Sequence, residues 1–422
     1  MTAHLLPPNR PLRIAILAHS TNPRGGVVHA LELGDALARL GHQVVVHAPD
    51  AKGAGFFRPA LCGTLSVPAS PVGADMTDMV RIRVADYVRH FEEPAHRAFD
   101  VFHAQDGISG NALASLKERG LIRAFARTVH HVDTFADRAL MALQTRAMVH
   151  ADRLLVVSRT WQDNLHGKLG RRAAIVGNGV DTTRFSPLPD GREEALRARI
   201  RLGAGPVFLA VGGIEGRKNS VRLLEAFARV HARHPAAQLL IAGGASLLDH
   251  HTVQQAFDLA LALLALPDGA VIRTGPLAQE DMPALYRIAD TLAFPSLKEG
   301  FGLVVLEAMA SGVPVATAHI APFTEYLGTE DVAWCDPLDV ASIAAALEAT
   351  LDAATRARLI ANGARIAARH DWASTAQAHL STYAQLLEGA EAAPAASGPT
   401  ASGPTTLEPT TSEPTALEAT HA

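Results

Sequence analysis

Short apolar runs alternate with helical patterns along almost the whole chain, and this alternation restricts the possible folds more than any other feature. In the first half the runs are Leu12–Ala18, Gln43–His47, Asp100–Ala104, Ala126–His130, Arg153–Val157 and Ala173–Val176. Helical stretches separate most of them, including Val27–Leu40, Ser109–Arg119 and Phe135–His150. Continuous apolar runs indicate strands that are buried on both faces. Helices between such strands predict a parallel, doubly wound α/β sheet.

One interruption divides this pattern into two series. Residues 182–203 carry Pro187, Pro189, Gly191 and a charged helical stretch, which is the composition of a linker. The apolar runs then resume at Pro206–Val211, Gln238–Ala242, Ala270–Arg273, Thr291–Phe294, Val313–Thr317 and Val332–Cys335. The helical stretches between them are Val221–His234, Leu248–Leu266, Met282–Ile288 and Leu303–Ala310. We therefore predict two Rossmann-like domains, residues 12–181 and 204–371, that face a central cleft.

The two ends of the chain lack this pattern. We expect residues 1–11 to be flexible. Residues 389–422 repeat Ser-Gly-Pro-Thr and Glu-Pro-Thr and offer no apolar face, so we expect a disordered tail. The stretch 372–388, just before this tail, is the last of three alanine-rich helical segments.

Charge and cysteine content exclude several classes of protein. The 422 residues carry a net charge of −4, which provides no basic surface for nucleic acid. The chain has only two cysteines, Cys62 and Cys335, which fits a reducing cytoplasm. No apolar run is long enough to cross a bilayer. The basic helical stretch Val80–Arg97 leaves peripheral contact with an anionic membrane open, although Glu92 and Glu93 favour a solvated helix face.

The most informative segment follows the apolar run Thr291–Phe294 and carries two glutamates, Glu299 and Glu307, separated by seven residues. The turn Gly300-Phe301-Gly302 points backbone N–H groups and the positive end of a helix at one place, where a diphosphate can bind. Carboxylates on either side accept hydrogen bonds from sugar hydroxyls. The segment therefore predicts a nucleotide-sugar site.

A second glycine turn follows the first predicted strand. Gly25 and Gly26 precede the helical stretch Val27–Leu40 and let a ligand approach the backbone closely. The turn lacks the Gly-x-Gly-x-x-Gly pattern of dinucleotide-binding enzymes, which disfavours a dehydrogenase.

Together these motifs resemble the retaining glycosyltransferases of family GT4, also called glycosyltransferase group 1, which have the GT-B fold. The resemblance covers about Leu12–Leu387. It depends on the Gly25-Gly26 loop, the strand that starts at Gly41, Asn178-Gly179-Val180-Asp181, Lys218-Asn219 and the two glutamates. It implies a GT-B architecture in which the C-terminal helix, residues 372–388, returns to the N-terminal domain.

The resemblance implies a role for each matching residue of the donor site. Glu299 would face the donor sugar and Glu307 would bind the ribose hydroxyls. Lys218, helped by Arg217, would neutralise the diphosphate. Backbone N–H groups for the donor would come from Gly25, Gly26, Gly300, Phe301, Gly302, Leu303 and Val304. Lys218, Glu299 and His130 are the predicted catalytic residues.

On the acceptor side, the resemblance matches His130 to a histidine beside the transferred sugar, with His131 as the competing choice. His103 and Asp106 follow the preceding strand on the same side and are candidates for acceptor contact. Glu325 is a weaker candidate on the same rim.

One position departs from the family pattern. Family members usually carry an arginine after the glycine that ends the first strand of the second domain, where this chain has Gly213. Arg217, beside Lys218, could supply the missing positive charge.

The chain also contains no Asp-x-Asp triplet, which metal-dependent glycosyltransferases of the other main fold use to hold a diphosphate. Its histidines form no His-x-His or His-Glu-x-x-His pattern, so we expect no metal and no cofactor.

The sequence thus predicts a cytoplasmic glycosyltransferase that moves a hexosyl group from a nucleotide-diphosphate sugar with retention of anomeric configuration. UDP and GDP are the favoured carriers, and the acceptor can be a sugar, a lipid or a small metabolite. Two other functions stay open. A sugar-nucleotide epimerase on the same fold would form product without an acceptor, and a non-catalytic binding protein would hold the donor without turnover.

Overall fold

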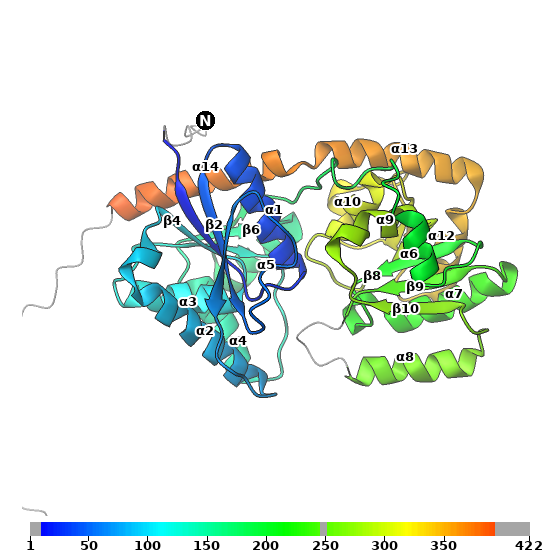
Figure 1. Ribbon diagram of the computed structural model, residues 1–422, viewed down its shortest axis with the longest axis horizontal. Helices are drawn as coiled ribbons and strands as arrows, with labels where there is room; N and C mark the ends of the chain where they lie inside the picture. The colour runs from blue at the N-terminus through cyan, green and yellow to red at the C-terminus, as the bar shows by residue number, and fades with distance from the viewer. Residues whose placement is uncertain (1–9, 245–250, 393–422) are drawn as a thin grey trace, which may run out of the picture.

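The computed structural model describes residues 10–244 and 251–392, which form two α/β domains built on two parallel sheets (Figure 1). The first sheet has seven strands in the order β3-β2-β1-β4-β5-β6-β7, and the second has six in the order β10-β9-β8-β11-β12-β13. Every pair of neighbouring strands runs parallel. The predicted pair of doubly wound domains is therefore confirmed.

The N-terminal sheet consists of β1 (Arg13–Leu17), β2 (Gln43–Asp50), β3 (Gly63–Pro68), β4 (Val101–Ala104), β5 (Ala126–Val129), β6 (Arg153–Val156) and β7 (Ala174–Ile175). Its helices are α1 (Gly25–Arg39), α2 (Met76–Glu92), the 3-10 helix η1 (Pro94–Arg97), α3 (Gly107–Glu118), α4 (Arg138–Val149) and α5 (Arg159–Leu169). Helices cover both faces of the sheet, so the central strand β1 is buried from Ile14 to Leu17.

The C-terminal sheet consists of β8 (Val207–Val211), β9 (Gln238–Ala242), β10 (Val271–Gly275), β11 (Thr291–Phe294), β12 (Val315–Ala318) and β13 (Ala333–Cys335). Its helices are α6 (Glu193–Arg199), η2 (Gly216–Lys218), α7 (Ser220–Arg233), α8 (His251–Leu264), η3 (Gln279–Asp281), α9 (Met282–Arg287), α10 (Leu303–Ala310), α11 (Phe323–Tyr326), α12 (Val340–Ala349) and α13 (Ala353–Arg369). The last helix, α14 (Trp372–Ala392), leaves this domain.

The differences from the predicted elements have simple causes. Strand β3 was not expected, because it lies at the sheet edge and Val67 is its only fully buried residue. The predicted helix Val80–Arg97 is interrupted, since α2 ends at Glu92 and Pro94 starts η1. Most of its basic side chains also have polar partners within the protein, namely those of Arg81, Arg83, Arg89, His96 and Arg97.

The chain crosses between the domains twice, and the two crossings touch. The amide of Val180 donates to the carbonyl of His370 at 2.8 Å. A Cβ atom on Gly179 would lie 2.5 Å from the amide nitrogen of Trp372. Only glycine lets the two backbones approach this closely, which explains why Gly179 occupies this position.

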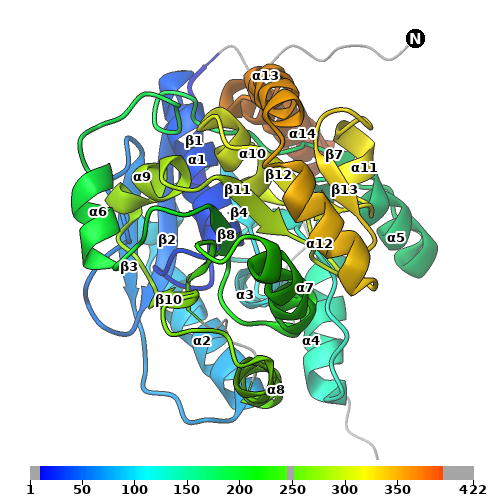
Figure 2. The ribbon, with the colours of Figure 1, turned by 90° about the vertical axis from the view of Figure 1, so that its right-hand side faces the viewer.

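Helix α14 starts at this crossing and runs back across the N-terminal domain (Figures 1 and 2). Its side chains Trp372, Ala376, Leu380, Tyr383 and Leu386 are buried in one core cluster with β1 and α1. The predicted return of the C-terminal helix is therefore confirmed. The helix continues to Ala392, beyond the predicted end at residue 388. The residues expected to be flexible at 1–9, and those of the expected tail from 393, lie outside the described residues.

Three fully buried histidines line the contact between α14 and the N-terminal domain. The ring of His379 lies 5.6 Å from that of His29 and 5.4 Å from that of His103. Burial lowers the pKa of His29 to about 4 and that of His379 to about 3. Burial also lowers the pKa of His103 well below its usual value. All three are therefore neutral at pH 7.

Because these histidines are neutral when buried, we predict that the protein loses stability in acid. On unfolding, the pKa of His379 returns from about 3 to about 6.5. Below pH 6.5 the unfolded chain therefore binds more protons than the native chain, and the free energy of unfolding falls until about pH 3. One histidine contributes a slope of about 1.4 kcal/mol per pH unit. We expect His379→Asn to reduce the slope by about that amount in urea titrations between pH 6.5 and 4. A His379→Asn slope equal to that of the wild type would contradict the prediction.

Candidate functional site

The turn after β11 has a conformation that only its glycines allow. Gly302 has φ of +93° and precedes α10, and a Cβ atom there would lie 2.5 Å from the ring of Phe323. Leu303 and Val304 form the first turn of α10, where backbone N–H groups lack partners within the helix. The ring of Phe301 is buried and stacks on Tyr326 at 4.8 Å. The turn is thus anchored, and it places the first-turn amides of α10 just after the carboxyl end of β11.

A compact group of charges surrounds Glu299. Its Oε1 atom accepts hydrogen bonds from Lys218 Nζ at 2.8 Å and from Arg217 Nη1 at 3.2 Å. Arg217 Nε also lies 3.0 Å from Glu215 Oε2. Burial alone would raise the pKa of Glu299, but the charges of Lys218 and Arg217 hold it below its usual value. Burial lowers the pKa of Lys218 more than Glu299 raises it. The pair is an ionised, largely desolvated contact of the kind that a diphosphate can join.

Two glycines at the end of β8 make room for this cluster. Gly212 has φ of +121°, and a Cβ atom there would lie 2.8 Å from Lys218 Cε. Gly213 packs against the carbonyl of Gly244, 2.9 Å from a Cβ position, so an arginine side chain does not fit. Arg217 is the cation found near the site instead. Asn219 ties this segment to β11 by donating to the carbonyl of Pro295 at 3.1 Å.

His130 lies between the two domains. Its ring is 3.5 Å from a Cβ position on Gly26, in the first turn of α1, and its carbonyl oxygen is 2.5 Å from a Cβ position on Gly300. Gln105 Oε1 lies 2.9 Å from His130 Nε2. Burial, followed by the neighbouring histidines, lowers the pKa of His130 well below its usual value, so the ring is neutral. His131, the competing choice, is half-exposed and pairs with Asp133 at 3.1 Å.

One of the acceptor candidates needs correction, and a second has a structural partner. His103 is fully buried, and its ring nitrogens bond Tyr383 and Thr128 at 2.7 and 2.8 Å, so it has no free group for an acceptor. Glu325 accepts from the amides of Arg159 and Thr160 at 2.7 and 2.8 Å. It therefore joins the C-terminal domain to the first turn of α5.

Asp106 is the remaining acceptor candidate, and its carboxylate already has a structural role. Oδ1 accepts from the amide of Ser109 at 2.9 Å and caps α3. Oδ2 lies 3.7 Å from His19 Nδ1. Oδ2 is buried and has no hydrogen-bond partner among the described residues, so an acceptor contact at Asp106 stays a prediction.

Glu307 lies on α10, and its hydrogen-bond partner is Tyr286 rather than the cations that pair with Glu299. Its Oε2 atom accepts a hydrogen bond from the hydroxyl of Tyr286 at 2.6 Å. Burial raises the pKa of Glu307. The two glutamates thus have opposite environments, one fixed by cations and one by a neutral hydroxyl.

Several residues that contact this site were not found from the sequence. Trp161 Nε1 donates to the carbonyl of Glu299 at 3.2 Å, and Lys298 Nζ donates to that of Val132 at 2.8 Å. Both contacts join the domains, as do the residues around His130. Gln105 and Tyr286 hold His130 and Glu307. Neither belongs to a recognisable motif, so only their position beside apolar strands and helices could have indicated them.

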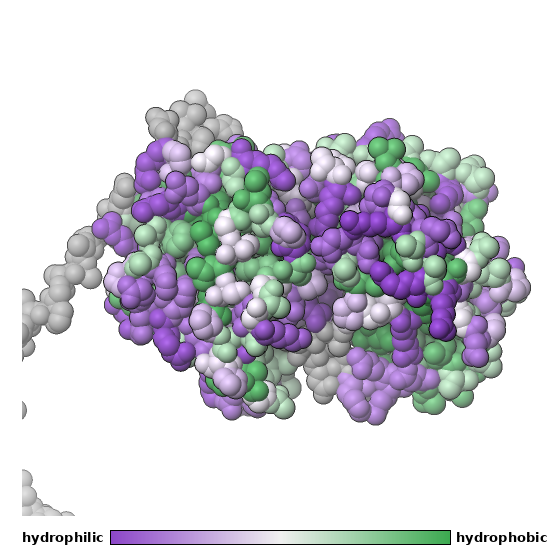
Figure 3. Space-filling model, in the orientation of Figure 1, coloured by the Kyte–Doolittle hydropathy of each residue, from purple (hydrophilic) through white to green (hydrophobic). Residues whose placement is uncertain are grey.

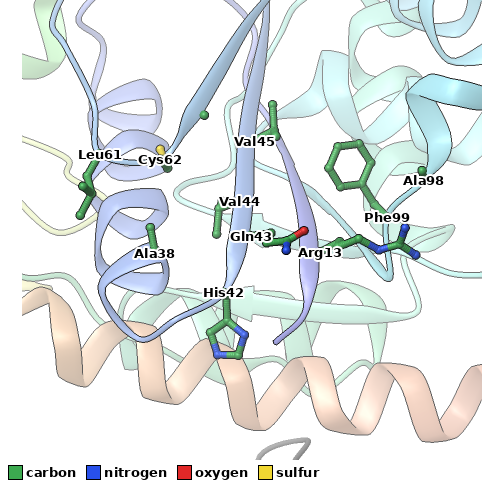
Figure 4. A pocket seen from close by; sticks show the side chains of 11 residues that line it. Arg13, Ala38, His42, Gln43, Val44, Val45, Leu61, Cys62, Ala98 and Phe99 are labelled. Carbon is green, nitrogen blue, oxygen red and sulfur yellow. The ribbon is translucent and has the colours of Figure 1, made fainter. Parts of the chain in front are cut away.

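Other parts of the surface lie apart from this site. A cavity of about 360 Å³ opens at the opposite, amino-terminal edge of the first sheet, where Arg13, His42, Gln43 and Cys62 contribute to its lining (Figure 4). Polar residues are present on both domains where they face each other in Figure 3. Within the part of the chain that the structure describes, no helix is long and apolar enough to span a membrane. The same residues contain no group of three or more His, Cys, Asp or Glu side chains that could hold a metal ion.

The close approach at Gly300 can be tested by adding one methyl group. In Gly300→Ala the Cβ atom would meet the carbonyl of His130 at 2.5 Å, so the backbones must separate. We expect the melting temperature to fall by the equivalent of about 1–3 kcal/mol. We also expect the radius of gyration in small-angle scattering to increase as the domains move apart. Gly167→Ala, in an open part of α5, is the control, and a variant that behaves like this control would refute the contact.

Comparison with known proteins agrees with this geometry. Residues 192–366 match the sequence model described as glycosyl transferases group 1, and residues 23–184 match that of glycosyltransferase family 4. A D-inositol 3-phosphate glycosyltransferase of Acidothermus cellulolyticus is 30% identical over 313 residues, which are 68% of each chain.

Solved structures show the same architecture. A sucrose-phosphate synthase of Thermosynechococcus elongatus superposes with a TM-score of 0.74 at 21% identity, covering 90% of this chain and 100% of that one. The Anabaena protein HepE, in complex with UDP-glucose, superposes with a TM-score of 0.71 at 18% identity, with 90% and 100% covered. These likenesses establish the GT-B fold. The family matches decide the rest: the chain belongs to glycosyltransferase family 4 and is a nucleotide-sugar-dependent glycosyltransferase.

Proposed function

We propose that the chain transfers a hexosyl group from a UDP- or GDP-sugar to a polar acceptor, with retention of anomeric configuration and without a metal ion. The observation that carries this proposal is the ionised contact of Lys218 with Glu299 beside the amides of the Gly300–Val304 turn. A cation and a helix N-terminus at one place suit a leaving diphosphate.

The donor takes its position from the C-terminal domain. Lys218 and Arg217 both pair with Glu299, so two positive charges share one carboxylate. A bound diphosphate would supply further negative charge to them. Glu299 then accepts hydrogen bonds from hydroxyls of the sugar, and Glu307 from those of the ribose. Because the structurally similar HepE was solved in complex with UDP-glucose, a UDP-sugar is the first donor to test.

In the proposed reaction the bond between the anomeric carbon and the diphosphate oxygen breaks as the acceptor oxygen bonds that carbon from the same face. The acceptor proton passes to the departing phosphate oxygen, so no protein nucleophile is needed. Lys218 and the α10 amides stabilise the charge that develops on the diphosphate. Neutral His130 can hydrogen-bond the transferred sugar, and closure at His130 and Gly300 excludes water.

The acceptor would enter beside Gly25 and Gly26, where the first turn of α1 lies against His130. Free amides of a helix N-terminus favour an acceptor with an anionic group. The name of the Acidothermus relative makes D-inositol 3-phosphate the first acceptor to test.

The donor is identified most directly by thermal shift. A ligand that binds only the native state at 100 times its Kd adds about 2.7 kcal/mol to the free energy of unfolding. We expect UDP- or GDP-sugars to raise the melting temperature of the wild type and to have almost no effect on Lys218→Met. Lys117→Met is the matched control, because Lys117 pairs with Asp152 outside the cleft and its loss should leave the shift intact. Equal shifts in both variants would remove Lys218 from the site.

An activity assay tests the proposed retention of configuration and the proposed independence of a metal ion. Proton NMR of a reaction with an α-linked donor should show an α-linked product, and EDTA should leave the rate unchanged. A β-linked product or loss of activity in EDTA would contradict the corresponding proposal. Conversion of the donor in the absence of any acceptor would favour the epimerase instead.

A further inference from the structure

We propose that Tyr286 is a positioning residue of the donor site, whose hydroxyl holds one carboxylate oxygen of Glu307 so that the other faces the ribose of a bound nucleotide. This inference rests on the proposed function, because it takes Glu307 to bind the ribose. The 2.6 Å hydrogen bond between Tyr286 and Glu307 carries it. Among the described residues, the other oxygen of Glu307 accepts no hydrogen bond.

The position of Tyr286 is fixed independently of any ligand. Its side chain is fully buried, and its ring packs edge-to-face against Phe185 at 5.7 Å. The next residue, Arg287, anchors α9 through Glu193 at 2.5 Å and Asp190 at 2.9 Å. The hydroxyl therefore has one direction available, and this direction leads to Glu307.

The charges around the pair keep the hydroxyl a donor. Burial and then the charge of Glu307 raise the pKa of Tyr286 well above its usual value, so it stays protonated. Burial raises the pKa of Glu307, while the Tyr286 hydroxyl and the charge of Arg184 lower it. The charge of Glu32, from α1, raises it slightly. Without the hydroxyl, Glu307 would both lose its fixed orientation and protonate at a higher pH.

This arrangement explains why an interior tyrosine, rather than phenylalanine, occupies the site. A carboxylate that accepts one bond from Tyr286 has a defined second oxygen, and a pair of vicinal hydroxyls can donate to it. The binding energy of the ribose then depends on a residue that does not itself touch the nucleotide.

The test measures ribose recognition rather than activity. Calorimetric Kd values would be compared for UDP and 2′,3′-dideoxy-UDP, and for GDP and 2′,3′-dideoxy-GDP, with the full-length wild type and Tyr286→Phe. We expect the wild type to bind the ribonucleotide of one pair roughly tenfold more tightly than its dideoxy form. In Tyr286→Phe this ratio should fall to about twofold, while the Kd of the dideoxy form stays the same. The loss of UDP or GDP binding in acid should also begin at a higher pH in the variant.

Tyr87→Phe is the matched control. Tyr87 is equally buried, but its hydroxyl bonds the carbonyls of Ala18 and His47 in the N-terminal domain. The Tyr87→Phe variant should lose stability without changing the ratio of the two Kd values. The inference is overturned if Tyr286→Phe keeps the wild-type ratio or weakens both forms equally, as a purely structural role requires. A wild-type ratio near one would also overturn it while leaving the diphosphate site intact. A wild type that binds none of the nucleotides would overturn the proposed function as well.

Discussion

The relation of the two domains depends on the contact between the two segments that join them. The chain passes from the first domain through Gly179 and returns through Asp371, and these backbones touch. Because α14 begins at this point and buries its apolar face against α1 and β1, the C-terminal domain is attached to the first domain at both ends. The segments that follow β5 and β11 meet where His130 contacts Gly300, and doubly wound sheets bind their ligands beyond such carboxyl ends of strands.

The electrostatics of the cleft follow from burial on both sides. Histidines on the N-terminal side are kept neutral, whereas Lys218 and Glu299 on the C-terminal side stay charged because each supplies the partner of the other. A buried ion pair of this kind contributes little to stability on balance. Its value lies in a cation and a carboxylate that are already oriented when the donor arrives, so little reorganisation is left for the reaction step.

Sequence reasoning succeeded where a residue acts through its own type and its place along the chain. The strands and the two glycine turns are of this kind, because period and turn chemistry are local. It failed where the surroundings decide. His103 follows the pattern of a cleft residue, yet Tyr383 from α14 occupies its ring nitrogen. Strand β3 pairs at an edge without an apolar pattern.

The sequence by itself determined that the chain forms two doubly wound domains with a glycine turn and two glutamates at the end of a strand, because hydrophobic period and glycine placement are written in neighbouring residues. Only the tertiary structure decided which side chains meet. Three contacts join residues from different elements. They are the contact of Lys218 with Glu299, the position of His130 between Gly26 and Gly300, and the hydrogen bond from Tyr286 to Glu307. Such contacts depend on how elements pack in three dimensions, and no local pattern records that packing.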